Sequence, residues 1–280
     1  MILVFGKTGQ VATELQAHAP EARFLSRTEA DLSDPGVCAA AIRTLTPTAV
    51  INAAAYTAVD AAETEERLAQ IRNGDAPGAM AQACADLGIP LVHLSTDYVF
   101  DGSGETPWKP DDPTGPLGVY GRTKLAGEEA IRATGCQHVI LRTSWVFSAH
   151  GANFVKTMLR LSGSRNALSV VKDQIGGPTP AAAIAQSCLR LVETLQDGQR
   201  GGTYHYAGSP AVSWKCFARE TFAAAHRDVV VRGIPTSEYP TAARRPLNSR
   251  LDCTSLQTDF GIAMPNWKPA LTETVETLIA

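Results

Sequence analysis

A tyrosine and a lysine stand four residues apart in the stretch "VYGRTKLAGEEAI", as Tyr120 and Lys124. On a helix, side chains at this spacing share one face, close enough for an ammonium group to act on a phenol. Such an ammonium stabilises the phenolate and lowers the pKa of the phenol from its usual value of about 10. We therefore expect Tyr120 to exchange a proton with a carbonyl or alcohol oxygen.

Two hydroxyl side chains end an apolar run just before a predicted loop, in "LSTDYVFDG". Hydroxyls at such a place can simply cap a turn, but near a tyrosine they can also hold a substrate oxygen. Ser95 and Thr96 are these residues, and we expect Thr96 to hold the oxygen that receives the proton.

A glycine-rich turn follows the first apolar run, in "FGKTGQVA". Gly6 and Gly9 would let the backbone turn sharply and approach a pyrophosphate, which the free N–H groups of the following helix would bind. Ala12 is the small residue at the third position of the pattern. A tight turn without a ligand is the alternative, but a strand, a turn and a helix in this order favour a dinucleotide site. The predicted cofactor contacts here are Gly6, Thr8, Gly9, Gln10 and Val11.

The end of the second apolar run, in "LSRTEADLSD", indicates which dinucleotide binds. A carboxylate at this place would bind the ribose of NAD, whereas an arginine accepts the 2'-phosphate of NADP. Ser26 and Arg27 therefore favour NADPH over NADH, although Arg27 also fits a solvated surface charge. Asp31 and Leu32 are candidates for the adenine end of the cofactor.

Three small residues follow the third apolar run, in "NAAAYTAVD". They would let a ribose or a nicotinamide lie close to the backbone, although small residues also suit simple core packing. The predicted contacts are Ala53, Ala54 and Ala55.

These candidate residues are separated by a regular alternation of short apolar runs and helical patterns. The runs are "ILVF", "ARFL", "AVIN", "PLVHLS" and "HVILR". Such alternation predicts βαβ units with right-handed crossovers, hence an α/β fold with a doubly wound parallel sheet of the Rossmann type. After Trp145 the rhythm loosens into loops rich in Gly and Pro. We expect a Rossmann domain that binds NADP(H) at 1–145 and mainly a smaller, substrate-binding lobe at 146–280, with part of the later chain returning to the sheet.

The composition describes an ordinary soluble protein of 280 residues, with a net charge of -3 and 44% hydrophobic residues. It gives no bulk electrostatic reason to bind nucleic acid or a membrane surface. No apolar stretch approaches the ~20 residues that cross a bilayer, and the N-terminus does not read as a signal peptide, so we expect a cytoplasmic protein. The six cysteines are widely spaced, and the histidines show no ligand spacing, so no catalytic metal is predicted.

The chain resembles the extended short-chain dehydrogenase/reductase family, and within it a branch that acts on nucleotide sugars. The resemblance runs through nearly the whole chain. It rests on the stretches "FGKTGQVATELQ", "NAAAYTAVDAAE", "LSTDYVFDGSGETPW", "YGRTKLAGE", "RTSWVF", "NFVKTMLRL" and "RRPLNSRLD". It implies an NADPH- or NADH-dependent reduction of the 4-keto group of dTDP-4-dehydro-L-rhamnose, with the nucleotide sugar as a small-molecule partner.

The resemblance also implies roles for single residues. By matching position, Tyr120 would be the proton donor and Lys124 its partner and a ligand of the cofactor ribose. Thr96 would be the hydroxyl that tunes the site. Thr96, Asp97 and Trp145 match positions that the family uses around the sugar nucleotide, although Trp145 equally suits a core aromatic.

The chain departs from the common pattern of the family in two places. Ala12 replaces the usual third glycine, and Tyr56 stands where histidine is usual, which puts a sugar contact there in doubt. The family can also bind magnesium, sometimes at a dimer contact, which leaves a homodimer open. Its ligands cannot be mapped on this chain; Glu273 and Glu276 are candidates that read more simply as a solvated helix face.

Two other functions stay open at this point. A nucleotide-sugar dehydratase or epimerase has the same fold, but dehydratases of this type carry an Asp-Glu pair after the strand-end threonine, where this chain has Asp97 and Tyr98. A non-catalytic NADP-binding regulatory subunit is the second alternative, since regulatory subunits of methionine adenosyltransferase resemble this branch.

Overall fold

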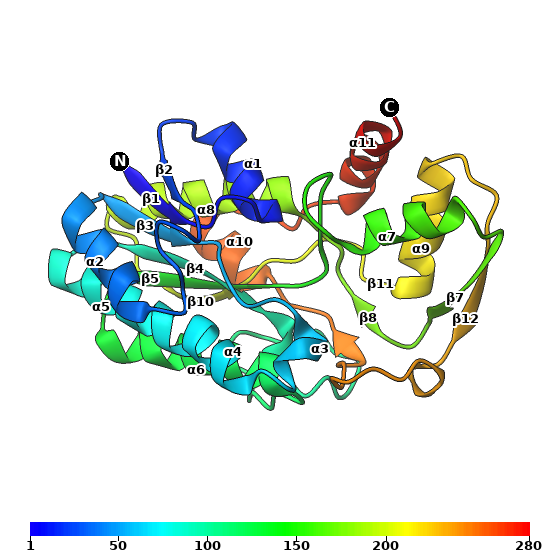
Figure 1. Ribbon diagram of the computed structural model, residues 1–280, viewed down its shortest axis with the longest axis horizontal. Coiled ribbons are helices and arrows are strands. Elements are labelled where there is room, and N and C mark those ends of the chain that lie inside the picture. The colour runs from blue at the N-terminus through cyan, green and yellow to red at the C-terminus, as the bar shows by residue number, and fades with distance from the viewer.

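A six-stranded sheet in which all neighbouring strands run parallel forms the body of the molecule (Figure 1). The computed structural model describes residues 1–280. The strands lie in the order β10-β5-β4-β3-β1-β2. Their bounds are β1 Ile2–Phe5, β2 Arg23–Leu25, β3 Ala49–Asn52, β4 Leu91–Thr96, β5 His138–Thr143 and β10 Gly202–His205. The prediction of a doubly wound parallel sheet is confirmed.

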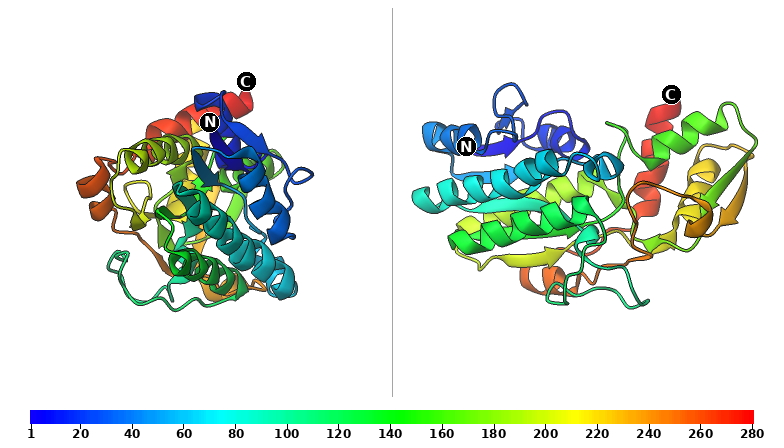
Figure 2. Two further views of the ribbon diagram at one scale, coloured as in Figure 1. Left: turned by 90° about the vertical axis from the view of Figure 1, so that its left-hand side faces the viewer. Right: turned by 60° about the horizontal axis from the view of Figure 1, so that its bottom comes forward.

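Helices cover both faces of this sheet, as Figure 2 shows from two further directions. Helices α1, α8 and α10 pack on one face, and α2, α5 and α6 on the other. Their bounds are α1 Gln10–His18, α2 Pro35–Leu45, α5 Ala76–Leu87, α6 Val119–Thr134, α8 Ala181–Gln196 and α10 Thr254–Phe260. Because both faces are covered, the strands are continuous apolar runs, and all four residues of β3 are buried.

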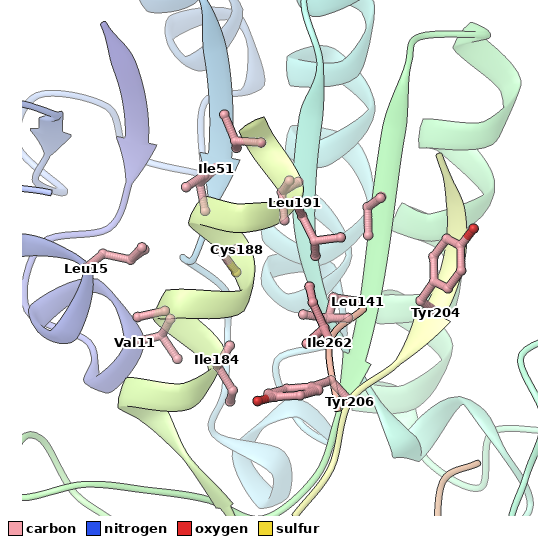
Figure 3. Close-up of a cluster of buried hydrophobic side chains, with 14 of the residues drawn as sticks. Val11, Leu15, Ile51, Leu141, Ile184, Cys188, Leu191, Tyr204, Tyr206 and Ile262 are labelled. Atoms are coloured by element: carbon pink, nitrogen blue, oxygen red, sulfur yellow. The ribbon is translucent and has the colours of Figure 1, made fainter. Parts of the chain in front are cut away.

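The core beneath α1 and α8 fixes the helix that follows the glycine turn (Figure 3). Val11 and Leu15 of α1 lie against Ile184 of α8, and Ile51 and Leu141 extend this core onto the sheet. Complete burial of a leucine side chain contributes about 1.5–3 kcal/mol. The first turn of α1 is thereby held at the carboxyl end of β1.

Local sequence signals set the ends of the helices. Asp34 accepts a hydrogen bond from the backbone N–H of Val37 at 3.2 Å, and Pro35 occupies the first turn of α2. Gly88 ends α5 in the left-handed conformation with φ 66°, which glycine adopts without steric cost. Short turns connect the sheet to the site: α3 Val59–Ala62, α4 Glu66–Gln70, the π-helical turn η1 Ile71–Asp75 and the 3-10 turn η2 Asp97–Val99.

A smaller lobe lies beside the sheet body, at the right of Figure 1. Aromatic side chains form its core, among them Phe147, Phe217 and Trp267. Its elements are β6 Val146–Phe147, α7 Phe154–Ser162, β7 Ala167–Val171, β8 Ile175–Gly176, β9 Thr179–Pro180, β11 Val212–Ser213, α9 Trp214–Ala224, β12 Val230–Ile234, η3 Thr236–Glu238, β13 Asn248–Ser249 and α11 Trp267–Ile279. Since α8, β10 and α10 come later in the chain yet pack in the sheet body, the two parts interleave. The division at residue 145 by function stays a prediction.

No helix combines the length and the apolar character needed to cross a membrane. All six cysteines are unpaired, and five of them are buried.

Candidate active site

A cavity of about 730 Å³ lies along the carboxyl ends of β1, β3, β4 and β5. Open parallel sheets bind their ligands at this edge, where the strand order reverses, here between β1 and β3. All residues predicted above to contact cofactor or substrate line this cavity. They are Gly6, Thr8, Gly9, Gln10, Val11, Ser26, Arg27, Asp31, Leu32, Ala53, Ala54, Ala55, Thr96, Asp97, Tyr120, Lys124 and Trp145. The fold thus brings them together, while the role of each stays a prediction.

The glycine turn has the shape of an anion cradle. Gly6 adopts φ 107°, and a Cβ there would meet the backbone of Ala53 at 3.4 Å, so the turn lies tight against β3. Gly9 precedes α1 without a side-chain cap, and a Cβ there would meet nothing within 4 Å. The first N–H groups of α1 therefore have no partner within the helix, as an anion such as a pyrophosphate requires.

The adenosine end of the cavity, after β2, is built from exposed polar groups. Both the backbone N–H and the hydroxyl of Ser26 donate to Glu29, at 2.9 and 2.7 Å, and Glu29 also pairs with Arg23 at 2.6 Å. The hydroxyl of Ser26 is therefore already engaged by a carboxylate. Arg27 lines the same end and takes part in none of the ion pairs of the chain, so its charge stays available to a ligand.

Helix α6 approaches the turns η1 and η2 unusually closely, because one glycine at each contact leaves room for it. A Cβ on Gly121 would lie 2.2 Å from the carbonyl oxygen of Tyr98, and one on Gly127 would lie 2.0 Å from that of Asn73. The first turn of α6 is thereby seated on η2. Tyr120 meets Tyr98 edge-on with ring centroids 5.5 Å apart.

The ammonium end of Lys124 turns toward β4. The side chain is 2% exposed, and its Nζ donates to the carbonyl oxygen of Leu94 at 2.7 Å and lies 3.1 Å from Nε2 of His93. Burial lowers the pKa of Lys124 to about 8, against the opposing charge of Glu128.

The expected lowering of the Tyr120 pKa by Lys124 is wrong for this structure. Burial raises the pKa of Tyr120 to about 12, and a hydrogen bond with the side chain of Thr96 opposes this only in part. The Lys124 nitrogen donates to the carbonyl oxygen of Leu94 and makes no hydrogen bond with the phenol. Tyr120 is consequently a protonated phenol at neutral pH, the form that can give a proton to a carbonyl oxygen.

Three buried polar atoms without a hydrogen-bond partner belong to residues of the cavity wall. They are Oδ2 of Asp97, Oγ1 of Thr143 and Nε of Arg72. Burial raises the pKa of Asp97 to about 6, although hydrogen bonds with the hydroxyls of Ser249 and Thr96 oppose this shift. The three atoms are almost fully enclosed by protein, so they do not face a ligand in the cavity.

Trp145 joins the cavity to the smaller lobe. Its backbone adopts φ 50°, which is rare for a bulky residue, and its ring stacks on Trp214 with centroids 3.5 Å apart. A Cβ on Gly176, in the "DQIGGPT" stretch, would touch the same ring. This loop therefore lies beside the cavity, and strain at a cavity residue is typical of functional sites.

Comparison with known proteins identifies the family. The family model described as "RmlD substrate binding domain" matches residues 1–279. The chain is 43% identical to dTDP-4-dehydrorhamnose reductase of Sinorhizobium fredii, over 99% of this chain and 97% of that protein. It is 42% identical to dTDP-4-dehydrorhamnose reductase of Escherichia coli K12, over 95% of this chain and 94% of that protein. The chain belongs to the dTDP-4-dehydrorhamnose reductase family.

Solved structures of this family have the same fold. The dTDP-4-dehydrorhamnose reductase of Clostridium acetobutylicum superposes with a TM-score of 0.93 at 33% identity, over 100% of this chain and 99% of that one. That of Bacillus anthracis, in complex with NADP, superposes with a TM-score of 0.92 at 32% identity, over 99% of this chain and 98% of that one.

Two departures from the family pattern acquire a physical meaning. Ala12 is fully buried where α1 meets the glycine turn, so its methyl group is accommodated there. Tyr56 does not line the cavity; its hydroxyl donates to Glu65 at 2.8 Å. Glu273 and Glu276 are exposed on α11, as a solvated helix face would be. No group of three or more metal-ligating side chains occurs, and the binding of magnesium stays a prediction from the resemblance.

Several residues of the cavity escaped the sequence analysis. Lys7 lies within the glycine turn, and Thr143 and Ser144 lie within the stretch "RTSWVF", so these three could have been found there, whereas Arg72 carries no motif. Arg72 lies on the π-helical turn η1, and its Nη2 is 3.5 Å from Asp31. Only the fold brings Arg72 to the cavity.

Proposed function

We propose that this chain uses NADPH to reduce the 4-keto group of dTDP-4-dehydro-L-rhamnose, giving dTDP-L-rhamnose. The observation that carries the proposal is its similarity to dTDP-4-dehydrorhamnose reductases over nearly the full length of both chains. The NADP complex of the Bacillus anthracis relative supports the choice of cofactor. The cavity supplies the groups that such a reaction needs.

The chemistry of reduction divides between the cofactor and the chain. NADPH, when bound, supplies the hydride. We propose that Tyr120 donates a proton to the C4 oxygen, because burial keeps its phenol protonated. The Thr96 hydroxyl would hold the same oxygen, and Lys124 would bind the cofactor ribose.

We propose that one end of the cavity binds the dinucleotide and the other end binds the nucleotide sugar. The glycine turn, Arg27 and Asp31 would bind the dinucleotide, and Asp97 and Trp145 would contact the nucleotide sugar. Both residues line the cavity together with Thr96 and Tyr120, which supports this assignment.

The cellular setting is also a proposal. Six unpaired cysteines fit a reducing compartment, which supports the cytoplasm. The partner that we propose is the small nucleotide-sugar substrate, and neither a nucleic acid polymer nor a membrane is proposed. A homodimer is a further proposal that follows from the resemblance.

The decisive experiment is a turnover assay. dTDP-4-keto-6-deoxyglucose and the partner epimerase supply the substrate, and NADPH oxidation is followed together with chromatography of the sugar nucleotide. We expect NADPH oxidation that depends on the epimerase and forms dTDP-L-rhamnose. NADPH oxidation without the epimerase would indicate another keto sugar as the substrate, and NADPH binding without turnover would favour a regulatory subunit. Tyr120→Phe is the matched control for background oxidation.

A further inference from the structure

A buried chain of hydrogen bonds runs from β3 through β4 to the lysine of the site. Nδ2 of Asn52 lies 3.0 Å from Nδ1 of His93, and Nε2 of His93 lies 3.1 Å from Nζ of Lys124. Asn52 and His93 are fully buried, and Lys124 is 2% exposed. No step of the proposed reaction uses Asn52 or His93.

The backbone of β3 fixes which way the amide of Asn52 points. Its Oδ1 accepts a hydrogen bond from the backbone N–H of Ala54 at 3.1 Å, so its NH₂ group faces the His93 ring. Burial, together with the charge of Lys124, holds the pKa of His93 well below its usual value, so the ring is neutral. A neutral imidazole has one donor and one acceptor nitrogen. Nδ1 must therefore accept from Asn52, and the ring proton lies on Nε2.

This tautomer places an N–H donor directly against Lys124. A neutral amine can accept that hydrogen bond with its lone pair and still donate to the carbonyl oxygen of Leu94. An ammonium group has three donors and no acceptor. Protonation of Lys124 therefore leaves two donors facing each other. The alternative is that His93 shifts its proton and Asn52 rotates, which breaks the hydrogen bond from Ala54.

We propose that Asn52 and His93 are positioning residues that disfavour the charged form of Lys124, beyond what its burial alone does. Each proton taken up by Lys124 costs one buried hydrogen bond at β3. The ammonium form of Lys124 is then less stable in the free protein than burial alone would make it, so Lys124 loses its proton at a lower pH. The link to catalysis rests on the proposed function, whereas the charge of Lys124 is a property of the free protein.

Other charges around Lys124 do not replace this effect. Glu128 of α6 favours the ammonium, but it is bound by Arg142 of β5 at 2.6 and 2.9 Å and by Arg132 at 3.3 Å, which offset its charge. The other titratable groups on these elements that line the cavity are Tyr120 of α6, Asp97 and Tyr98 of η2, and Arg72 of η1, and His138 of β5 acts on His93.

The test measures protonation directly, by nitrogen NMR of the free protein labelled with ¹⁵N in the lysine side chains and histidine rings. Lys124→Met assigns the lysine signal. In the wild type we expect Lys124 to titrate at or below pH 8, and His93 to carry its proton on Nε2 at pH values above that midpoint, where Lys124 is an amine.

Two substitutions at one position then separate the tautomer from burial. Asn52→Ser removes the amide, frees His93 to change tautomer, and should raise the Lys124 midpoint by about one pH unit, a tenfold change in the amine-to-ammonium ratio. Asn52→Asp keeps the shape and can accept from both Ala54 and His93, so it should raise the midpoint further. Asn73→Ser is the matched control. Asn73 is an equally buried amide, but it is hydrogen-bonded to Tyr56 and Thr123 and takes no part in the hydrogen bonds between Asn52, His93 and Lys124.

A wild-type His93 protonated on Nδ1 would overturn the proposal without any variant. So would a Lys124 midpoint that Asn52→Asp leaves unchanged, or that Asn73→Ser raises as much as Asn52→Ser does. If Asn52→Ser does not fold, the wild-type tautomer of His93 above the Lys124 midpoint still decides, whereas Asn52→Asp also adds a negative charge that favours the ammonium by itself. None of these readouts needs the sugar nucleotide, so a failure of the proposed substrate leaves the test intact.

Discussion

The two ends of the cavity treat the same chemical group in opposite ways. At the reacting end Asp97 is 3% exposed, and burial raises the pKa of its carboxyl to about 6. At the adenosine end Asp31 is partly exposed, and the backbone N–H of Ser33 donates to it at 2.9 Å, which lowers its pKa. The difference shows that burial favours the protonated, neutral form of a carboxyl group, whereas exposure to water together with a backbone hydrogen bond favours its charged form.

The cations of the two ends follow the same division. Lys124 is enclosed, its pKa is lowered to about 8, and its nitrogen is bound to β4. Arg27 lies on the open wall after β2 and belongs to no ion pair of the chain. We therefore expect substitutions at the reacting end to change turnover and pH behaviour, and substitutions at the adenosine end to change affinity and its salt dependence.

The largest effect should follow the loss of the Tyr120 hydroxyl. Tyr120→Phe removes the proton donor but preserves the packing against Tyr98, so turnover should fall about 100- to 10,000-fold while NADPH still binds. Steady-state kinetics and a fluorescence titration of NADPH measure the two quantities. Lys124→Met should damage both, and the double variant should be little worse than the worse single one, as for residues that act as one unit. A loss below about tenfold in Tyr120→Phe, worth only ~1.4 kcal/mol of barrier, would remove this tyrosine from the acid's role.

The second effect is a gain in stability, expected when Asp97 is replaced by asparagine. Because the pKa of Asp97 is raised to about 6, the folded protein binds this proton more tightly than the unfolded chain does. The contribution of Asp97 to stability is therefore present at acid pH and is lost as pH rises through about 6. The free energy of unfolding of Asp97→Asn, measured relative to that of the wild type, should therefore increase from pH 4 to pH 7. The increase should be roughly 3 kcal/mol for a shift of about two pKa units.

Urea unfolding of both proteins at the two pH values measures this gain. Comparing pH values cancels the fixed cost of leaving the new amide unpaired where Oδ2 of Asp97 had no partner. We expect turnover to fall in the same variant. A difference in stability that does not change with pH would contradict the raised pKa of Asp97.

The comparison of the two ends also shows what the sequence could predict. The parallel sheet follows from apolar runs at regular spacing, and the glycine turn follows from glycines between a strand and a helix. The approach of α6 to η2 also has a local sign, Gly121 in "YGRTK", although its contact with Tyr98 needs the fold.

The protonation states at the reacting end could not be predicted in this way. Spacing placed Lys124 beside Tyr120, but it could not show that β4 captures the lysine nitrogen. Nor could it show that burial would outweigh that charge at the phenol, because burial sums over strands distant in sequence. Arg72 reaches the cavity for the same reason, without a motif of its own.

A smaller effect is expected from Arg27 at the adenosine end. If its guanidinium binds the 2'-phosphate, Arg27→Ala should weaken NADPH binding about 10- to 150-fold, which corresponds to one charge-assisted hydrogen bond of roughly 1.5 to 3 kcal/mol. NADH, which lacks the phosphate, should bind unchanged. Calorimetric titration with both cofactors measures the pair of affinities. Equal affinities in the wild type, unaltered by the substitution, would show that Arg27 does not read the phosphate.

The smallest effect is expected from Asp31, and it completes the contrast with Asp97. The lowered pKa of Asp31 means that its contribution to stability is present above its unfolded pKa and is lost as the pH falls through its folded value. Asp31→Asn should therefore destabilise the protein at neutral pH, by at most about 0.5 kcal/mol, since the partly exposed group is screened by water and the new amide can still accept from Ser33. Urea unfolding at low and high salt measures it. High salt should shrink this small loss but leave the Asp97→Asn gain intact, because exposed charges are screened and buried ones are not. If both effects responded to salt alike, the two ends of the cavity would not differ in the way proposed.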